Sequence, residues 1–376
     1  MGGPEPFSAF LPAPLPPIPG LNQDSAFQAL QERATLALGR LDEVGKLLPD
    51  PHLFLYMYVR KEAVLSSQIE GTQSSLSDLL LFEDPGAPGV PEGDAHEVSN
   101  YVQAMEHGLT SMRKVPLSLR LIKEIHGVLM KGTRGGDKQP GEFRRSQNWV
   151  GGTRPGNALY VPPPPHEVPI ALGALEKFLH GDPVQMPTLL KAGMAHAQFE
   201  SIHPFLDGNG RLGRLLITFV LCSEGALSKP LLYLSLHFKE HRKEYYAALQ
   251  RVREEGDWEG WMSFYLEGVE AVAGQACETA RKIMRLFEQN HRKIQELGKA
   301  AATAARVHDL LKKHCIISLP TIQKELKVAF PTAAKAMHNL EKLSLVREYT
   351  GKRRNRCFAY DPYLRLLQEG TEPIRN

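Results

Sequence analysis

Apolar positions recur at helical spacing over most of the chain, which predicts a mainly α-helical protein. The periodicity dominates from residue 25 to about residue 314. It breaks at 84–93, at a segment of turn and strand character around 141–163, and at 183–187. The first break is rich in proline and glycine, so we expect a loop there between an N-terminal helical segment and a larger helical core.

The two ends of the chain differ in character from this helical body. Repeated prolines in residues 1–20 predict an extended arm, because proline fixes φ and interrupts helices. The organisation that we expect is an arm at 1–20, a helical segment at 21–92, a core domain at 93–298 and a C-terminal module at 299–376.

The C-terminal module has the order helix, short helix, helix and hairpin. We expect helices at 300–314, 321–327 and 332–343 and strands at 346–350 and 357–360, joined by a basic loop at 351–356. This order resembles a winged helix. Residues 300–376 hold 14 Lys and Arg against 7 Asp and Glu. Such a positive patch could contact DNA phosphates through 299–376, although the same scaffold also holds protein partners.

The richest chemistry lies at 203–214, with the sequence His-Pro-Phe-Leu-Asp-Gly-Asn-Gly-Arg-Leu-Gly-Arg. Pro204 disfavours α geometry in the residue before it, so the helix that contains 191–201 should end at His203. A polar turn follows, and a second helix with a buried stripe should begin near Gly210.

This turn carries the groups that a magnesium nucleotide needs. Glycines and helix-start N–H groups let a phosphate approach the backbone. Arg211 and Arg214 share the face opposite the buried stripe and can grip phosphate oxygens. Asp207 is a hard oxygen ligand of the kind that Mg²⁺ takes beside substrate phosphates. His203 can exchange a proton near neutral pH, so it is the candidate general base.

The ordered combination at 203–214 resembles the signature of the Fic family, His-Pro-Phe-x-Asp-Gly-Asn-Gly-Arg-x-x-Arg, without a departure. The resemblance implies a Fic helical core that transfers AMP from Mg-ATP to a hydroxyl of a target protein and of itself. It implies that His203 deprotonates the hydroxyl, that Asp207 holds Mg²⁺ against the α and β phosphates, and that Phe205 packs in the core. The nucleotide-binding residues that it implies in this turn are Gly208, Asn209, Gly210, Arg211 and Arg214.

Residues 141–163 alternate and turn like a β-hairpin with a long tip. Taken alone, the pattern is typical of a surface hairpin. The resemblance instead implies a flap over the active site, against which a target segment adds as another strand. The further nucleotide-binding residues that the resemblance implies are Val150, Gly151, Gly152 and Thr153 in the flap, and Tyr245 and Tyr246 beside the adenine.

A further motif lies upstream of the core. Apolar residues at helical spacing run from 55 to 69, and Gly71 suits the position just past a helix end, so Glu70 should lie in the last turn. By pattern alone Glu70 is a solvated glutamate. The sequence Ser-x-x-x-Glu-Gly, from Ser66 to Gly71, resembles the family's inhibitory motif. It implies that Glu70 pairs with Arg214, so that ATP binds with its α phosphate misaligned for in-line attack.

Composition and charge indicate the general class of the protein. The 376 residues, 42% hydrophobic and 23% charged with a net charge of +3, suit a globular protein of two or three domains. The longest apolar run, 215–222, is too short to span a bilayer, and residues 1–20 do not resemble a signal peptide. The cysteines are scattered and form no metal or disulfide motif. We therefore expect a cytoplasmic protein without a membrane partner.

Other interpretations stay open. A zinc hydrolase would use His196, Glu200 and His203 on one helical face, but its motif needs Glu directly after the first His, where Ala197 stands. A non-catalytic regulator would use the nucleotide pocket as a sensor and the winged helix as its working part. Within the family, Glu70 could position water so that the same site removes AMP from a target. The oligomeric state is open, a homodimer included.

Overall fold

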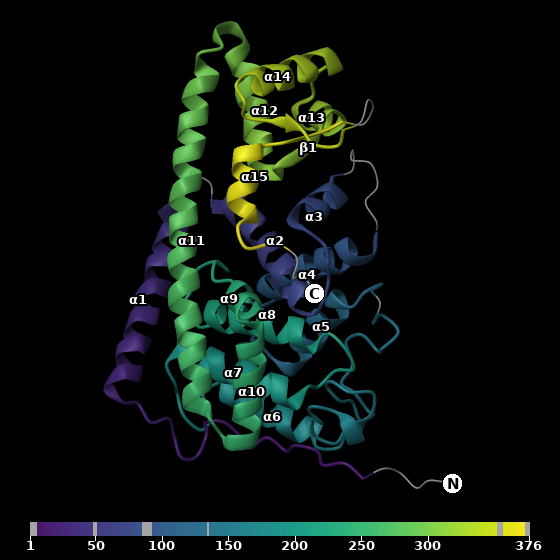
Figure 1. The fold of residues 1–376 in the computed structure, drawn as a ribbon, viewed down its shortest axis with the longest axis vertical. Coiled ribbons are helices and arrows are strands. Elements are labelled where there is room, and N and C mark those ends of the chain that lie inside the picture. The colour runs from purple at the N-terminus through teal and green to yellow at the C-terminus, as the bar shows by residue number, and fades with distance from the viewer. Residues whose placement is uncertain (1–5, 48–50, 85–91, 134, 352–355, 373–376) are drawn as a thin grey trace. The chain divides into compact units, whose positions relative to one another are not determined.

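The fold is mainly helical, as the periodicity predicts, with about 65% of residues in helices and one small sheet. A computed structural model describes residues 6–47, 51–84, 92–133, 135–351 and 356–372 (Figure 1). Most of the basic loop expected at 351–356 and of the loop at 84–93 therefore lies outside the described residues. Over the ranges that are described, none of the helices combines the length and the hydropathy needed to cross a membrane.

The chain divides into two compact units. The first comprises Met1–Gly39 and Asn100–Val272, and the second comprises Arg40–Ser99 and Ala273–Asn376. The domain boundaries expected near residues 20, 92 and 298 stay predictions, because this division groups residues by their internal contacts. Glu70 belongs to the second unit and the turn at 203–214 to the first.

The first unit is built around one helical hairpin. Two helices, α7 (Thr188–Ile202) and α8 (Asn209–Ser223), are buried along nearly their whole length. A helix buried on all sides forms the centre of a core rather than its surface. The helices and helix segments around it are α1 (Ser25–Leu47), α4 (Glu92–Ser111), α5 (Leu119–Leu129), α6 (Val168–Leu179), α9 (Ser235–Glu240), α10 (Arg242–Glu255) and α11 (Trp258–Gln295), of which α1, α4 and α11 continue into the second unit.

A glycine permits the close packing of α7 on α8. A Cβ added at Gly213 of α8 would meet Oε1 of Glu200 on α7 at 2.4 Å. Glu200 is almost fully buried, with 7% of its surface exposed. A larger residue at 213 would therefore have to displace the carboxylate of Glu200 from between the two central helices.

Aromatic rings pack around the middle of α7. His196 is fully buried, its ring stacks near those of Phe238 and Trp261, and its Nε2 lies 2.9 Å from the hydroxyl of Tyr245. The Trp261 indole N–H donates to the carbonyl of Gly193. Burial lowers the pKa of His196 to about 3, so the imidazole is neutral near pH 7.

The described part of the N-terminal arm lies extended against the first unit, as its prolines predict. The Phe10 N–H donates to the carbonyl of Val161 (2.9 Å), and the Gln198 amide donates to the carbonyl of Ala13 (2.7 Å). Leu15 is buried. The arm is thus fixed to the core at several points and pairs with the segment expected to be the flap.

The second unit contains the predicted C-terminal helices and strands. It holds α2 (Pro51–Ile69), α3 (Leu76–Glu83), α12 (Ala301–His314), β1 (Ile316–Ser318), α13 (Leu319–Leu326), α14 (Phe330–Lys342), β2 (Arg347–Glu348), β3 (Cys357–Ala359) and α15 (Asp361–Gln368), besides parts of α1, α4 and α11 (Figure 1). Short 3₁₀ turns occur at Pro155–Asn157 in the first unit and Gly298–Ala300 in the second.

The sheet of the second unit has three antiparallel strands in the order β1-β3-β2. Ile316 pairs with Ala359 on one side of β3, and Arg347 pairs with Ala359 on the other. The expected hairpin is present as β2 and β3. Neither β1 nor α15 was expected, since they span only three and eight residues and so offer little periodicity.

We predict that His196 makes stability depend on pH. Its folded pKa of about 3 lies below the unfolded value of 6.5, so the unfolded chain binds the extra proton and stability falls as pH drops below 6.5. The His196→Gln variant keeps an acceptor for Tyr245 but cannot titrate. The variant's unfolding free energy should therefore lie below that of the native protein by an amount that shrinks by about 1.4 kcal/mol for each unit that the pH is lowered, between roughly pH 6 and 4. Urea titrations of both proteins across this range measure the deficit, and a constant deficit would contradict the prediction.

Candidate active site

The turn between α7 and α8 begins and ends with left-handed residues. α7 ends at Ile202, and His203 has φ 49° and ψ 58°, which confirms that the helix stops before Pro204. Gly208 has φ 77°, and α8 starts at Asn209. These backbone reversals let the chain leave one buried helix and enter the next within six residues, 203–208.

Buried side chains hold the turn in shape. Asn209, 2% exposed, accepts from the N–H of Phe205 through Oδ1 (2.9 Å) and donates to its carbonyl through Nδ2 (2.8 Å). Phe205 is fully buried, as the family resemblance implies. Asn209 therefore shapes the turn with its side chain, while its backbone N–H lies at the start of α8.

His126 of α5 braces the turn and was not identified from the sequence. Its ring stacks on Phe205 with centroids 3.7 Å apart and an interplanar angle of 10°. The Gly141 N–H donates to Nδ1 (2.8 Å), so Nε2 carries the proton and donates to the carbonyl of Asp207 (3.0 Å). Burial lowers the pKa of His126 to about 4, so the ring is neutral. Its partners lie far along the chain, and no local pattern marks it.

Asp207 carries a half-exposed carboxylate in a positive setting. Its Oδ2 lies 3.0 Å from Nζ of Lys138, and its Oδ1 accepts from the Gly208 N–H (2.7 Å) and lies 3.7 Å from a guanidinium nitrogen of Arg211. Burial opposes ionisation, but Lys138, Gly208 and Arg211 together lower the pKa of Asp207. The group is therefore an ionised oxygen ligand that suits Mg²⁺ beside phosphates.

The two arginines of α8 are nearly buried. Arg211 is 7% exposed and Arg214 is 3% exposed, so the face that they share, opposite the apolar stripe, is also covered by protein. The reason is that α8 is enclosed on all sides, and periodicity cannot distinguish a solvent face from a polar face inside the protein. Buried guanidinium groups lose much of their hydration, which favours the arrival of an anion.

Side chains from other elements bind the carbonyl end of α7. Arg144 donates to the carbonyls of His203 (2.9 Å) and Ile202 (3.4 Å), and the Tyr160 hydroxyl donates to the carbonyl of Ser201. Asn148 donates to the carbonyl of Phe205 (2.9 Å). Three residues of the segment 141–163 are therefore anchored at the base of the turn that carries His203.

The flap is not the regular hairpin that we expected. In place of two paired strands, Val150 and Tyr160 form a single bridge, and a 3₁₀ turn, Pro155–Asn157, occupies the tip. Gly151 and Gly152 both have positive φ, which takes the chain out of strand geometry directly after Val150. The Val150 side chain is half-buried, and Gly151, Gly152 and Thr153 are exposed.

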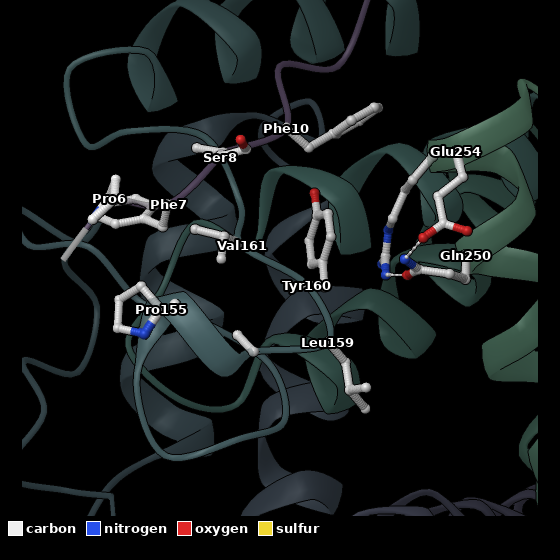
Figure 2. A pocket seen from close by; sticks show the side chains of 14 residues that line it. Pro6, Phe7, Ser8, Phe10, Pro155, Leu159, Tyr160, Val161, Gln250 and Glu254 are labelled. Carbon is white, nitrogen blue, oxygen red and sulfur yellow. Dashed lines mark hydrogen bonds between the residues drawn. The ribbon is translucent and has the colours of Figure 1, made fainter.

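A groove of about 700 Å³ lies beside this segment, between the arm and α10 (Figure 2). Figure 2 shows Tyr160 in the middle of the lining residues, with Pro6 and Phe7 to its left and Gln250 and Glu254 to its right. None of the residues 203–214 lines this groove. It is therefore a separate feature from the turn that carries the predicted nucleotide-binding residues.

The remaining predicted residues lie in different surroundings. Tyr245 is 1% exposed and belongs to the aromatic cluster around His196, whereas the next residue, Tyr246, is 41% exposed. Ser66 is buried within α2. Glu70 is exposed and follows the end of α2 at Ile69, so it lies just beyond the last turn rather than in it. Gly71 has φ 99°, the left-handed conformation expected of a glycine just past a helix end.

Comparison with known proteins identifies the family. The Fic/DOC family N-terminal model matches residues 28–110, and the Fic/DOC family model matches residues 116–221. The protein adenylyltransferase Fic of Aedes aegypti is 36% identical over 210 residues, which are 54% of this chain and 38% of that protein. A probable protein adenylyltransferase of Aquifex aeolicus is 28% identical over 202 residues, which are 54% of this chain and 57% of that protein. The chain thus spans less than two thirds of the length of these relatives.

Solved structures show the same fold at low identity. A Fic family protein from Desulfovibrio desulfuricans aligns with a TM-score of 0.59 at 18% identity, over 90% of this chain and 97% of that chain. A Fic domain containing signaling protein from Bacteroides thetaiotaomicron aligns with a TM-score of 0.54 at 18% identity, over 66% of this chain and 97% of that chain. The solved structures show the shared fold, and the two matched models establish that the chain belongs to the Fic/DOC family.

We predict that Gly208→Ala strains the turn. The new Cβ would meet Sδ of Met130 at 2.7 Å, and φ would stay at 77°. The unfolding free energy should fall by about 1–2 kcal/mol. Gly173→Ala is the matched control, because Gly173 lies inside α6 with nothing within 4 Å of a new Cβ, and it should stabilise by about 0.5–1 kcal/mol. Chemical denaturation measures both; equal effects would count against a strained turn.

Proposed function

We propose that the chain transfers AMP from ATP to a hydroxyl side chain of a target protein. The observation that supports this most is the single turn that joins a candidate base, an ionised carboxylate and the N-terminal end of a buried helix with two arginines. A triphosphate has the charge and the oxygen atoms that such a turn binds. The names of the relatives, protein adenylyltransferase, support the same reaction class.

In the proposed step, His203 takes the proton of the target hydroxyl. The hydroxyl oxygen then forms a bond to the α-phosphorus, and the bond from this phosphorus to the bridging oxygen of the β phosphate breaks, releasing pyrophosphate. Gly208, Asn209 and Gly210 cradle the phosphates, and Arg211 and Arg214 bind the β and γ phosphates and the departing pyrophosphate. Asp207 would hold Mg²⁺, which when bound neutralises phosphate charge.

The target segment would dock on the flap. The carbonyl of Val161 already accepts from the N–H of Phe10 in the arm, so this edge of the flap is taken. Backbone groups alternate between the two edges of an extended segment, and Val150 is paired with Tyr160. We therefore place the incoming strand at the opposite edge, beside Trp149, whose side chain is 40% exposed.

We further propose that Glu70 restrains the reaction by pairing with Arg214. Glu70 is an exposed carboxylate directly after a helix that buries Ser66. Its motif, Ser66 to Gly71, resembles the family's inhibitory sequence. When Arg214 is occupied, the γ phosphate loses its anchor, so the α phosphate is misaligned for attack.

This proposal predicts opposite effects for two substitutions. Glu70→Gly should increase label transfer from α-labelled ATP by an order of magnitude or more, because the γ phosphate regains Arg214. Adding His203→Ala should reduce that transfer by about 10²–10⁴-fold, because the base is lost. Transfer is measured as label retained on the protein, and mass spectrometry of the adduct identifies AMP.

The controls separate the two parts. ATP labelled on the γ phosphate should leave no label on the protein. Equal transfer with and without Glu70 would rule out the restraint but keep the reaction. Equal transfer with and without His203 would rule out the reaction and favour a nucleotide-sensing regulator.

We also propose that the last part of the second unit acts as a winged helix that contacts DNA. α14 would be the recognition helix, with β2 and β3 as the wing. A groove of about 380 Å³ runs between the start of α12 and α14 and includes Lys299, Thr332, Lys335 and Asn339. Two lysines and short polar side chains suit phosphate oxygens.

We expect the full chain to shift duplex DNA at low salt, with affinity falling steeply as salt rises. Reversing both lysines of the groove, Lys299→Glu with Lys335→Glu, should weaken binding about tenfold or more. Lys282→Glu is the control, since this lysine lies on α11 in a surface pair with Glu278. Salt-independent binding, or equal loss in the control, would favour a protein partner for this module.

A further inference from the structure

We propose that Arg144 is a positioning residue that fastens the flap to the carbonyl end of α7, so that the flap and the backbone of His203 are held as one rigid piece. The inference rests on the proposed function, because it assigns Arg144 to the placement of the candidate base. It concerns a residue that carries no part of the phosphate cradle.

The guanidinium of Arg144 joins two segments that are distant in sequence. Nε donates to the carbonyl of His203 at 2.9 Å, and Nη2 donates to that of Ile202 at 3.4 Å. The same group donates to Ser146 through Nη1 and to Pro163 through Nη2, both in the flap. The Arg144 side chain thus contacts the start of the turn at 203–208 and both ends of the flap segment.

The helix end needs these donors. The last carbonyls of any α-helix have no partner within the helix. In α7 the shortage is greater, because Pro204 has no N–H to offer to the carbonyl of Glu200. Arg253 of α10 supplies a donor to that carbonyl at 3.3 Å.

Every carbonyl from residue 200 to residue 205 receives a donor from outside α7. Arg253 donates to the carbonyl of Glu200, and the Tyr160 hydroxyl donates to that of Ser201. The Arg144 side chain donates to the carbonyls of Ile202 and His203, and its backbone N–H donates to that of Pro204. Asn148 donates to the carbonyl of Phe205. All but one of these donors come from the flap segment. Within this series Arg144 serves three consecutive carbonyls, including the one on His203.

The chemistry of the site requires arginine rather than lysine. Arg144 is 2% exposed, and its four side-chain hydrogen bonds all go to backbone carbonyls. The negative end of the α7 dipole stabilises the buried charge. A planar guanidinium can serve carbonyls in several directions at once, whereas an ammonium is a point charge on a flexible stem.

The geometry of His203 explains why a clamp is needed there. Its left-handed backbone, φ 49°, is uncommon for a residue with a Cβ and costs on the order of 1 kcal/mol or more. Without bonds to its carbonyl, the residue would relax toward a commoner conformation. The imidazole would then move relative to the phosphate cradle, which begins at Gly208 on the far side of the turn.

The test uses Arg144→Lys in the full chain with Glu70→Gly as the parent. ATP affinity, measured by calorimetry, should stay within about threefold, because the cradle is untouched. The turnover rate of AMP transfer should fall on the order of 10²-fold, the scale expected for a base misplaced by about 1 Å. Hydrogen exchange should rise together in peptides covering 199–206 and 145–161, which both contain backbone N–H groups, whereas residues 162–165 are prolines.

Arg251→Lys is the matched control, because Arg251 lies on α10 and pairs with Asp257 at the surface. It should leave exchange in both peptides and the transfer rate unchanged. Asn148→Leu is the second variant for use if Arg144→Lys does not fold. It removes one of the two donors to the carbonyl of Phe205 and a longer bond to the carbonyl of His203 (3.3 Å), so it should raise exchange at 199–206 with a smaller loss of rate.

The outcomes separate this inference from the proposed function. If hydrogen exchange rises in only one of the two segments, Arg144 does not couple the flap to His203. The same conclusion follows if exchange rises in both segments while the rate of AMP transfer stays unchanged. If ATP affinity falls in step with the rate, Arg144 acts on the nucleotide and the positioning role is wrong. If the parent transfers no AMP, the proposed function fails, and the exchange data still decide whether Arg144 links the two segments.

Discussion

The structure of the first unit depends on how the carbonyl end of α7 is satisfied. This helix is buried along its length and ends in a polar turn, where backbone acceptors would otherwise remain without donors inside the protein. Donors from the flap and from α10 supply them. The requirement for hydrogen bonds at one helix end thus fixes the positions of the flap, the turn and the candidate base together.

Electrostatics give the turn a second function. Arg211 and Arg214 are nearly buried at the start of α8, where the helix dipole adds positive potential. Asp207 supplies a carboxylate, held ionised by Lys138 and the Gly208 N–H. The proposed triphosphate suits such a site, because its oxygen atoms carry negative charge and can accept hydrogen bonds from the arginines and from the start of α8.

Fold and sequence similarity carry different information for this chain. The solved structure from Desulfovibrio desulfuricans has the same fold although only 18% of the aligned residues are identical. The fold therefore does not depend on most of the individual residues. Burial of α7 and α8 needs apolar residues of suitable size rather than particular ones. By contrast, a turn with His203, Gly208 and Asn209 needs those residue types, because a left-handed backbone, a close approach and an amide with two hydrogen-bonding atoms all depend on them.

The sequence alone determined the helical class, the end of α7 just before Pro204 and the helices α12, α13 and α14 to within a few residues. Each of these follows from spacing of three to four residues or from the local geometry of proline and glycine. It did not foresee the loss of strand structure after Val150, the burial of Arg211 and Arg214, or the end of α2 before Glu70. Only the tertiary structure revealed His126 and Arg144, because their partners lie 81 and 59 residues away. A hydrogen bond across such a separation leaves no periodic trace in the sequence, so it becomes visible only when the folded chain brings the donor to its acceptor.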